Sequence, residues 1–174
     1  MTDDILAAVV IALNQYLTKK MGEEHPDPSP YVILENISRL SQQQQNNVHS
    51  IMNDRVVVTL INIEEDRVLH NSYASQSATG AKPQPKQKLS LYCLFSISVE
   101  PYSRALQFLS IVMDFFYHHP RIALAPYLGS LEKTDSYPEN IEIELVSLNM
   151  EQLSELWGTL GCKHLPSVFY KIRI

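Results

Sequence analysis

Apolar residues recur at helical spacing in three segments of the chain, 3–21, 102–117 and 150–160. In the first segment, acidic residues come early and lysines come late, an order that suits the dipole of a helix. Asn149 precedes the third segment and Gly161 follows it, as an N-terminal cap and a stop signal would. The spacing therefore predicts three amphipathic helices.

Runs of β-branched, aromatic and alternating residues predict five strands. They span residues 31–34, 55–66, 89–99, 141–146 and 168–174. Residues 56–63 are mostly apolar on both faces, so we expect that strand to be central and covered on two sides, and we expect 89–99 to be a second central strand. The proline-rich segment 25–30 and the polar segments 41–47 and 72–88 are expected to be connectors, because they lack residues that could anchor them in a core.

The order of these elements predicts the fold class. A helix is followed by three strands, and then helix and strand alternate twice, which favours an α+β domain over a parallel α/β one. We expect a mainly antiparallel sheet of about five strands, flanked by the three helices, in a single domain over residues 1–174.

Composition narrows the possible partners. The 14 basic residues are outnumbered by 19 acidic ones, so the chain lacks the basic footprint that nucleic-acid binding requires. Acidic residues precede the apolar stretch at the N-terminus, where a signal peptide would carry positive charge, and no apolar run is long enough to cross a membrane. We therefore expect a cytoplasmic protein with no nucleic-acid or membrane partner, in which Cys93 and Cys162 are reduced, buried thiols.

Motifs for catalysis or cofactor binding are missing from the sequence. It contains no glycine-rich phosphate loop, and Gly129 and Ser130 lack the second glycine of a nucleophile elbow. His118 and His119 are neighbours on a predicted helix and would point about 100° apart, which suits a polar helix end better than a metal site. No catalytic residue, metal or cofactor is therefore predicted.

An acidic cluster ends the strand 55–66 and is the best candidate for paired carboxylates. It comprises Glu64, Glu65 and Asp66, with Arg67 next in the chain. A small metal-dependent hydrolase could use Glu64, Asp66 and a histidine, although no nucleophile or oxyanion donor accompanies them. The alternative is a solvated strand end or a site of ion pairs between subunits, and we predict that Glu64, Glu65 and Arg67 serve such contacts.

Three blocks of sequence resemble a known family. They are VVVTLINIEEDRVLHN (56–71), LSLYCLFSISVEPYSRALQFLSIVMDFFYHHP (89–120) and IEIELVSLNMEQLSELWGTLGCKHLPSVFYKIR (141–173). Together they resemble the cap, or tail-terminator, proteins of extracellular contractile injection systems, which include antifeeding-prophage and Photorhabdus virulence-cassette particles. The resemblance covers nearly the whole chain, which matches the family without the extension that many members carry.

The resemblance implies a structural assembly protein and not an enzyme. It implies a homo-oligomeric ring, expected to be a hexamer, that closes the membrane-distal end of the inner tube and contacts the last layer of sheath. The tube and sheath proteins would then be its partners. An adaptor elsewhere in such a particle, for instance at the baseplate, is the alternative within the same class.

Two further expectations concern the last helix and strand. Trp157 shares its helix side with Leu153, Leu156 and Leu160, so we predict that it anchors a core or an interface. The strand 168–174 is a candidate docking edge for β-augmentation through Tyr170, Lys171 and Arg173, because charges within a β-rich strand are typical of exposed edges. The alternative is that this strand lies inside the subunit's own sheet.

Overall fold

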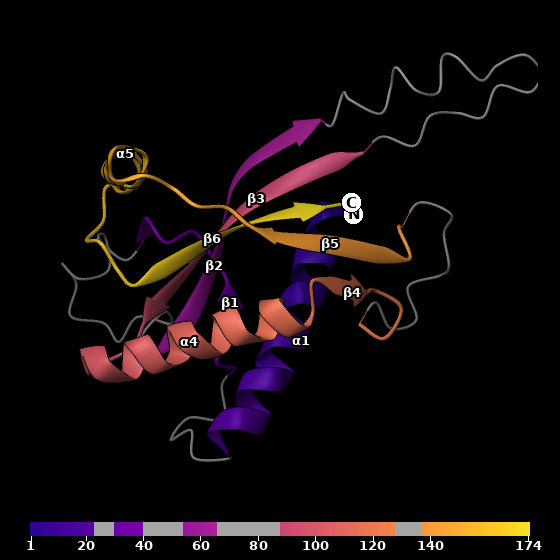
Figure 1. The fold of residues 1–174 in the computed structure, drawn as a ribbon, viewed down its shortest axis with the longest axis horizontal. Coiled ribbons are helices and arrows are strands. Elements are labelled where there is room, and N and C mark those ends of the chain that lie inside the picture. The colour runs from indigo at the N-terminus through magenta and orange to yellow at the C-terminus, as the bar shows by residue number, and fades with distance from the viewer. Residues whose placement is uncertain (23–29, 40–53, 66–87, 128–136) are drawn as a thin grey trace, which may run out of the picture.

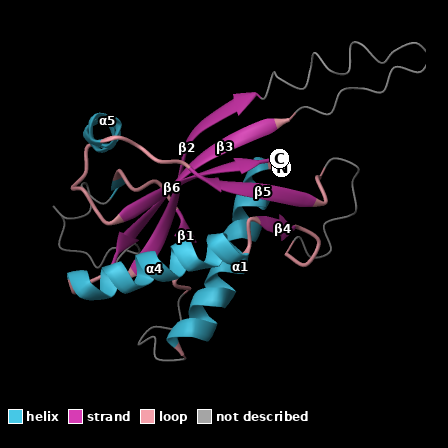
Figure 2. Ribbon diagram, in the orientation of Figure 1, coloured by secondary structure: helices cyan, strands magenta, loops and turns pink. Residues whose placement is uncertain are grey.

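The structure, a computed structural model, describes residues 1–22, 30–39, 54–65, 88–127 and 137–174. Figures 1 and 2 show helices packed with a twisted sheet in this part of the chain. The elements are α1 (Thr2–Met21), β1 (Val32–Leu34), β2 (Arg55–Glu65), β3 (Leu89–Ser98), α4 (Tyr102–His118), β4 (Arg121–Ala123), β5 (Asn140–Leu145), α5 (Met150–Leu160) and β6 (Ser167–Arg173). The predicted α+β class, with a mainly antiparallel sheet and three helices, is confirmed.

The described strands form one six-stranded sheet in the order β1-β2-β3-β6-β5-β4. Only β1 and β2 pair in parallel, and every other pair of neighbours is antiparallel. The sequence predicted about five strands and missed β4, which has three residues and directly follows α4. Ile122 is its only buried residue, so the strand is too short to show an alternating pattern.

One face of the sheet is covered by α1 and α4, which cross beneath it in Figure 1. The apolar stripes of both helices meet the inward side chains of the central strands there, and Phe95 of β3 lies edge-on to Phe116 of α4, with 5.1 Å between ring centroids. Ile5, Leu13 and Phe108 are at most 1% exposed. This face holds the main hydrophobic core, because two helices bury a wide apolar surface against it.

The opposite face is covered only in part, by α5. Asn149 caps this helix as predicted, within a capping box: the Gln152 N–H donates to Asn149 Oδ1, and the Asn149 N–H donates to Gln152 Oε1. Trp157 is 5% exposed and packs with Ile37, Val57 and Leu94 in a second, smaller core. The prediction that Trp157 is a buried anchor is confirmed for the subunit core.

The last strand lies inside the sheet, so the prediction that residues 168–174 form a docking edge is wrong. β6 pairs with β3 on one side and with β5 on the other, and its main-chain groups are engaged in both ladders. Tyr170 is 4% exposed and packs against Phe95 and Phe116, with ring centroids 5.6 and 4.5 Å away. Burial of this apolar side outweighs the edge-like signal of the two charged residues.

The two-sided cover predicted for residues 56–63 holds for only half of β2. Val56, Val57 and Val58 are fully buried, but the strand becomes exposed from Asn62 onward, and Ile63 is 46% exposed. Figure 1 shows the reason, because β2 continues past the region that the helices cover. An irregularity in register between Leu60 and Asn62 marks this change.

Candidate interaction surface

The part of the sheet that α5 leaves uncovered carries a row of polar side chains, which we call the charged face. It crosses β2, β3, β6, β5 and β4 in that order, so residues distant in sequence become neighbours. Side chains alternate between the two faces of a sheet, so the residues that lie between members of the charged face along each strand point toward the main core. The charged face consists of Glu64, Tyr92, Lys171, Arg173, Glu142, Glu144 and Arg121.

Ion pairs connect neighbouring strands of the charged face. The Arg121 Nη2 atom lies 2.7 Å from Glu142 Oε1, and Arg173 Nη2 lies 2.9 Å from Glu144 Oε2. All four side chains are 46–75% exposed, so each pair stabilises the fold by only about 0 to 1 kcal/mol. The charges are therefore available for contacts with another molecule at little cost to the subunit.

Tyr92 lies at the centre of the charged face and joins its two halves. Its hydroxyl donates a 2.9 Å hydrogen bond to Glu64 Oε2 on β2. On its other side, Lys171 Nζ lies 5.5 Å from the centroid of the Tyr92 ring, and the ring of Phe169 stacks at 6.0 Å. The contact between the rings of Tyr92 and Phe169 adds a side-chain link between β3 and β6 at the centre of the charged face.

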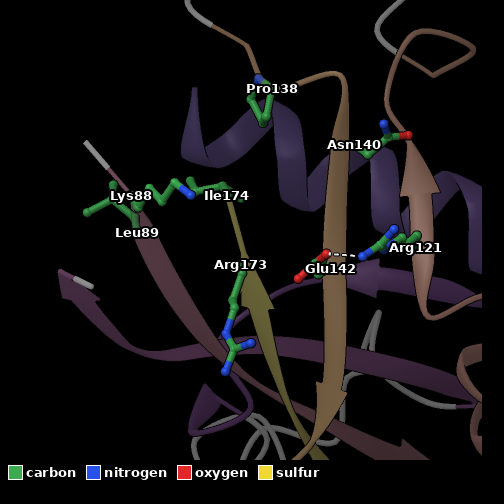
Figure 3. A pocket seen from close by; sticks show the side chains of 8 residues that line it. All are labelled: Lys88, Leu89, Arg121, Pro138, Asn140, Glu142, Arg173 and Ile174. Carbon is green, nitrogen blue, oxygen red and sulfur yellow. Dashed lines mark ion pairs between the residues drawn. The ribbon is translucent and has the colours of Figure 1, made fainter. Parts of the chain in front are cut away.

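An open depression of about 460 Å³ lies at one end of the charged face, and Figure 3 shows its lining. Three cations, Lys88, Arg121 and Arg173, contribute to it against a single carboxylate, that of Glu142. Two of these cations take part in ion pairs, Arg121 with Glu142 and Arg173 with Glu144. The remaining lining residues are Leu89, Pro138, Asn140 and Ile174.

The structure separates the residues that the sequence predicted for partner contacts. Glu64, Lys171 and Arg173 lie on the charged face, whereas Glu65 is an exposed residue paired with Leu89 and belongs to the other side of β2. Tyr170 is buried in the core, so its side chain is not on the surface. Arg67 lies outside the described residues. A role in partner contacts stays a prediction for the exposed residues of this set.

Sequence reasoning missed four members of the charged face, Tyr92, Arg121, Glu142 and Glu144. The Ile-Glu-Ile-Glu alternation at 141–144 places both glutamates on the face opposite the buried isoleucines, so this signal was available. Arg121 had no such signal, because its position depends on the unpredicted strand β4.

The candidates for chemistry are dispersed in the described part of the chain. His118 Nδ1 lies 3.2 Å from Asp114 Oδ1, while the ring of His119 stacks on Phe115 with centroids 4.8 Å apart. Burial raises the pKa of the Cys93 thiol to about 12, so this thiol stays protonated and unreactive at neutral pH. Cys162 is a free cysteine as predicted, but it is only partly buried.

Within the described ranges, no three His, Cys, Asp or Glu side chains are grouped closely enough to hold a metal ion. Asp66, which the hydrolase alternative requires, lies outside these ranges. None of the helices in the described ranges combines the length and hydropathy needed to span a bilayer.

The family model described as "Pvc16 N-terminal domain" matches residues 4–174. No curated protein matches the chain. A solved structure described as "Cryo-EM Structure of an Extracellular Contractile Injection System, PVC sheath/tube terminator in extended state" matches with a TM-score of 0.56 and 14% identity, over 100% of this chain and 55% of that chain.

These findings confirm the resemblance drawn from the sequence. At 14% identity the structural match shows a shared fold, and this chain spans about half the length of the solved chain.

Proposed function

Because the chain belongs to the Pvc16 N-terminal domain family, we propose that it is a structural subunit that terminates the sheath and tube of a contractile injection particle. The observation that carries this proposal is the structural match, which extends over 100% of the chain and involves a sheath/tube terminator. The proposal is one of assembly and requires no catalytic residue, cofactor or metal.

In this proposal the subunits form a homo-oligomeric ring, a hexamer by the family resemblance, at the membrane-distal end of the inner tube. The ring closes the tube and contacts the last layer of sheath, and it assembles in the cytoplasm as part of a particle. The weak, exposed ion pairs of the charged face support this idea, because such pairs can exchange partners when a neighbour binds.

The test is a polymerisation assay with purified tube and sheath proteins of the same particle. We expect the protein to bind one end of each polymer in electron micrographs and to narrow the distribution of polymer lengths. Native mass measurement of the free protein reports whether it forms a ring by itself. Unchanged polymer lengths and bare ends would contradict termination, and binding only at the baseplate end would favour the adaptor alternative.

A matched pair of charge reversals makes the assay specific for the charged face. Lys171→Glu alters the centre of that face, and we expect it to weaken binding to the polymer end. Lys163→Glu makes the same change at an exposed position after α5, outside the charged face, and should bind as the unchanged protein does. Equal binding by both variants would mean that the docking surface lies elsewhere.

A further inference from the structure

The β4 edge of the sheet presents main-chain groups that point away from the subunit. Alternate residues of an antiparallel strand direct their N–H and C=O groups to the same neighbour. The Ile143 N–H donates to Pro120 O, and the Leu124 N–H donates to Glu139 O, so Ile122 is the residue of β4 that faces β5. Arg121 and Ala123, both exposed, therefore turn their N–H and C=O groups outward.

The outer half of β2 presents a second open edge. β1 pairs only with Val56–Val58, so it leaves the rest of β2 without a described neighbour on that side. Leu89 exchanges main-chain hydrogen bonds with Ile174, so the N–H and C=O groups of Leu89 point toward β6. Because these groups alternate in direction along a strand, the register of β2 with β3 directs the N–H and C=O groups of Glu64 toward β3. Ile63 and Glu65 consequently direct their N–H and C=O groups outward.

A groove of about 340 Å³ runs beside the β4 edge and has room for part of an extended strand. Its walls are α1, the end of α4, and β4 itself. Tyr16, Phe115 and Ile122 give it an apolar base, and Lys19 and Arg121 supply positive charge. The β2 edge has the complementary character, since exposed Ile63 is followed by Glu64 and Glu65.

The directions of β4 and β2 allow the sheet of one copy to continue into the sheet of the next copy. Four antiparallel steps separate β2 from β4, so both strands run the same way. Parallel pairing can then set Ile63 opposite Ile122, with the Ile63 N–H donating to Arg121 O and the Ala123 N–H donating to Ile63 O. Ile63 and Ile122 both lie on the side of the sheet that faces α1 and α4. The joined sheet therefore keeps this side in the same orientation from one copy to the next.

This register also brings opposite charges together on the other side of the joined sheet. Glu64 of one copy falls opposite Ala123 of the next and diagonal to Arg121, within reach of its side chain. Arg121 already pairs with Glu142, but a guanidinium has five N–H donors and can bond a second carboxylate.

We propose that copies of this chain associate head to tail, with the outer half of β2 of one copy adding as a parallel strand to β4 of the next. Such an interface uses two different surfaces of each subunit, so repetition produces a closed ring or an open filament. The inference rests on the proposed ring and specifies its contact. Pairing of β2 with β2 of another copy is disfavoured, because the glutamates of the two edges would repel one another.

Cysteine cross-linking tests the contact, in a background where Cys162→Ser removes the accessible thiol. Residues opposite each other on paired strands lie about 4.8 Å apart, within the range that a disulfide spans. We expect Glu64→Cys and Ala123→Cys variants, mixed and oxidised, to form cross-linked dimers, and the double variant to form a ladder of oligomers. Pairing Glu64→Cys with Met150→Cys, an exposed residue of α5, is the matched control and should give none.

Proline substitution tests the main-chain hydrogen bonds. Ile63→Pro and Ala123→Pro each remove an outward N–H and leave the internal ladders intact, so both variants should stay folded by circular dichroism and lose self-association. Glu64→Cys dimers formed without the Ala123→Cys variant, or assembly by folded proline variants, would overturn the edge contact.

A second readout separates this contact from the proposed function. Polymer ends that are still terminated by the folded proline variants would overturn the edge contact and keep the terminator role. If the Glu64→Cys and Ala123→Cys variants cross-link but the unchanged protein leaves polymer ends bare, the edge contact is supported and the terminator role fails.

Discussion

The two faces of the sheet differ in how they are covered. On one face, α1 and α4 bury a continuous core that includes Phe95, Phe108 and Val112, none more than 1% exposed. On the other, α5 covers a small cluster around Trp157, and the remaining surface is occupied by exposed ion pairs. The subunit is thus stabilised mainly from one side, which leaves the second side for recognition.

The two faces differ in this way because buried apolar contacts and exposed ion pairs contribute differently to folding. Buried apolar area contributes to folding wherever it lies, whereas an exposed ion pair contributes little until a partner removes it from water. Substitutions on the helix-covered face should therefore affect folding, and substitutions on the charged face should affect assembly.

The largest effect is expected for Phe95→Ala, in the main core. The side chain is fully buried and contacts Phe116 and Tyr170, so its removal leaves a cavity in the region where both helices meet the sheet. We expect a loss of about 3 to 5 kcal/mol in the free energy of unfolding, measured by urea denaturation. Tyr117→Ala, at an 82% exposed position of α4, is the control and should change it by less than about 0.5 kcal/mol.

Trp157→Ala tests whether the smaller core also supports the fold. Burial of this single tryptophan predicts a blue-shifted fluorescence maximum in the free subunit and a loss of about 3 kcal/mol in the variant. Its buried Nε1 has no hydrogen-bond partner among the described residues, so Trp157→Phe should cost much less than Trp157→Ala. A red-shifted maximum would mean that α5 detaches from the sheet in solution.

Helix and strand positions were predictable because their patterns are local. The periodicity of α4, the capping residues of α5 and the β-branched run of β2 each depend on residues close together in the chain. Strand order depends on contacts between distant segments. The sequence of β6 suits an edge or a centre equally, and only its pairing with β3 and β5 decides between them.

The charged face was predictable only in part, for the same reason. Glu64 was identified as a member of an acidic cluster, but its hydrogen bond to Tyr92 spans 28 positions in sequence. Arg121 and Glu142 become partners only after β4 and β5 pair. The sequence therefore revealed which side chains were polar, while the sheet determined which of them meet.

Asn149→Ala should give an intermediate effect, confined to α5. The side chain accepts a 2.8 Å hydrogen bond from the Gln152 N–H, and loss of such an N-terminal cap costs about 1 kcal/mol. The matched control is Ser154→Ala, an exposed position in the middle of the same helix, which should be neutral or slightly stabilising. Equal losses in both variants would contradict a specific role for the capping box.

The smallest effect on the free energy of unfolding is expected for substitutions in the charged face. A double-mutant cycle of Arg121→Ala and Glu142→Ala isolates their interaction, and we expect a coupling of less than about 1 kcal/mol that falls as salt is raised. Salt screens exposed charges, with a Debye length of about 3 Å at 1 M, so the remaining coupling should then be negligible. The same cycle for Arg173 and Glu144 provides an independent comparison on the neighbouring strands. A coupling above about 2 kcal/mol that resists salt would show that this face stabilises the subunit itself, and the contrast between the two faces would then fail.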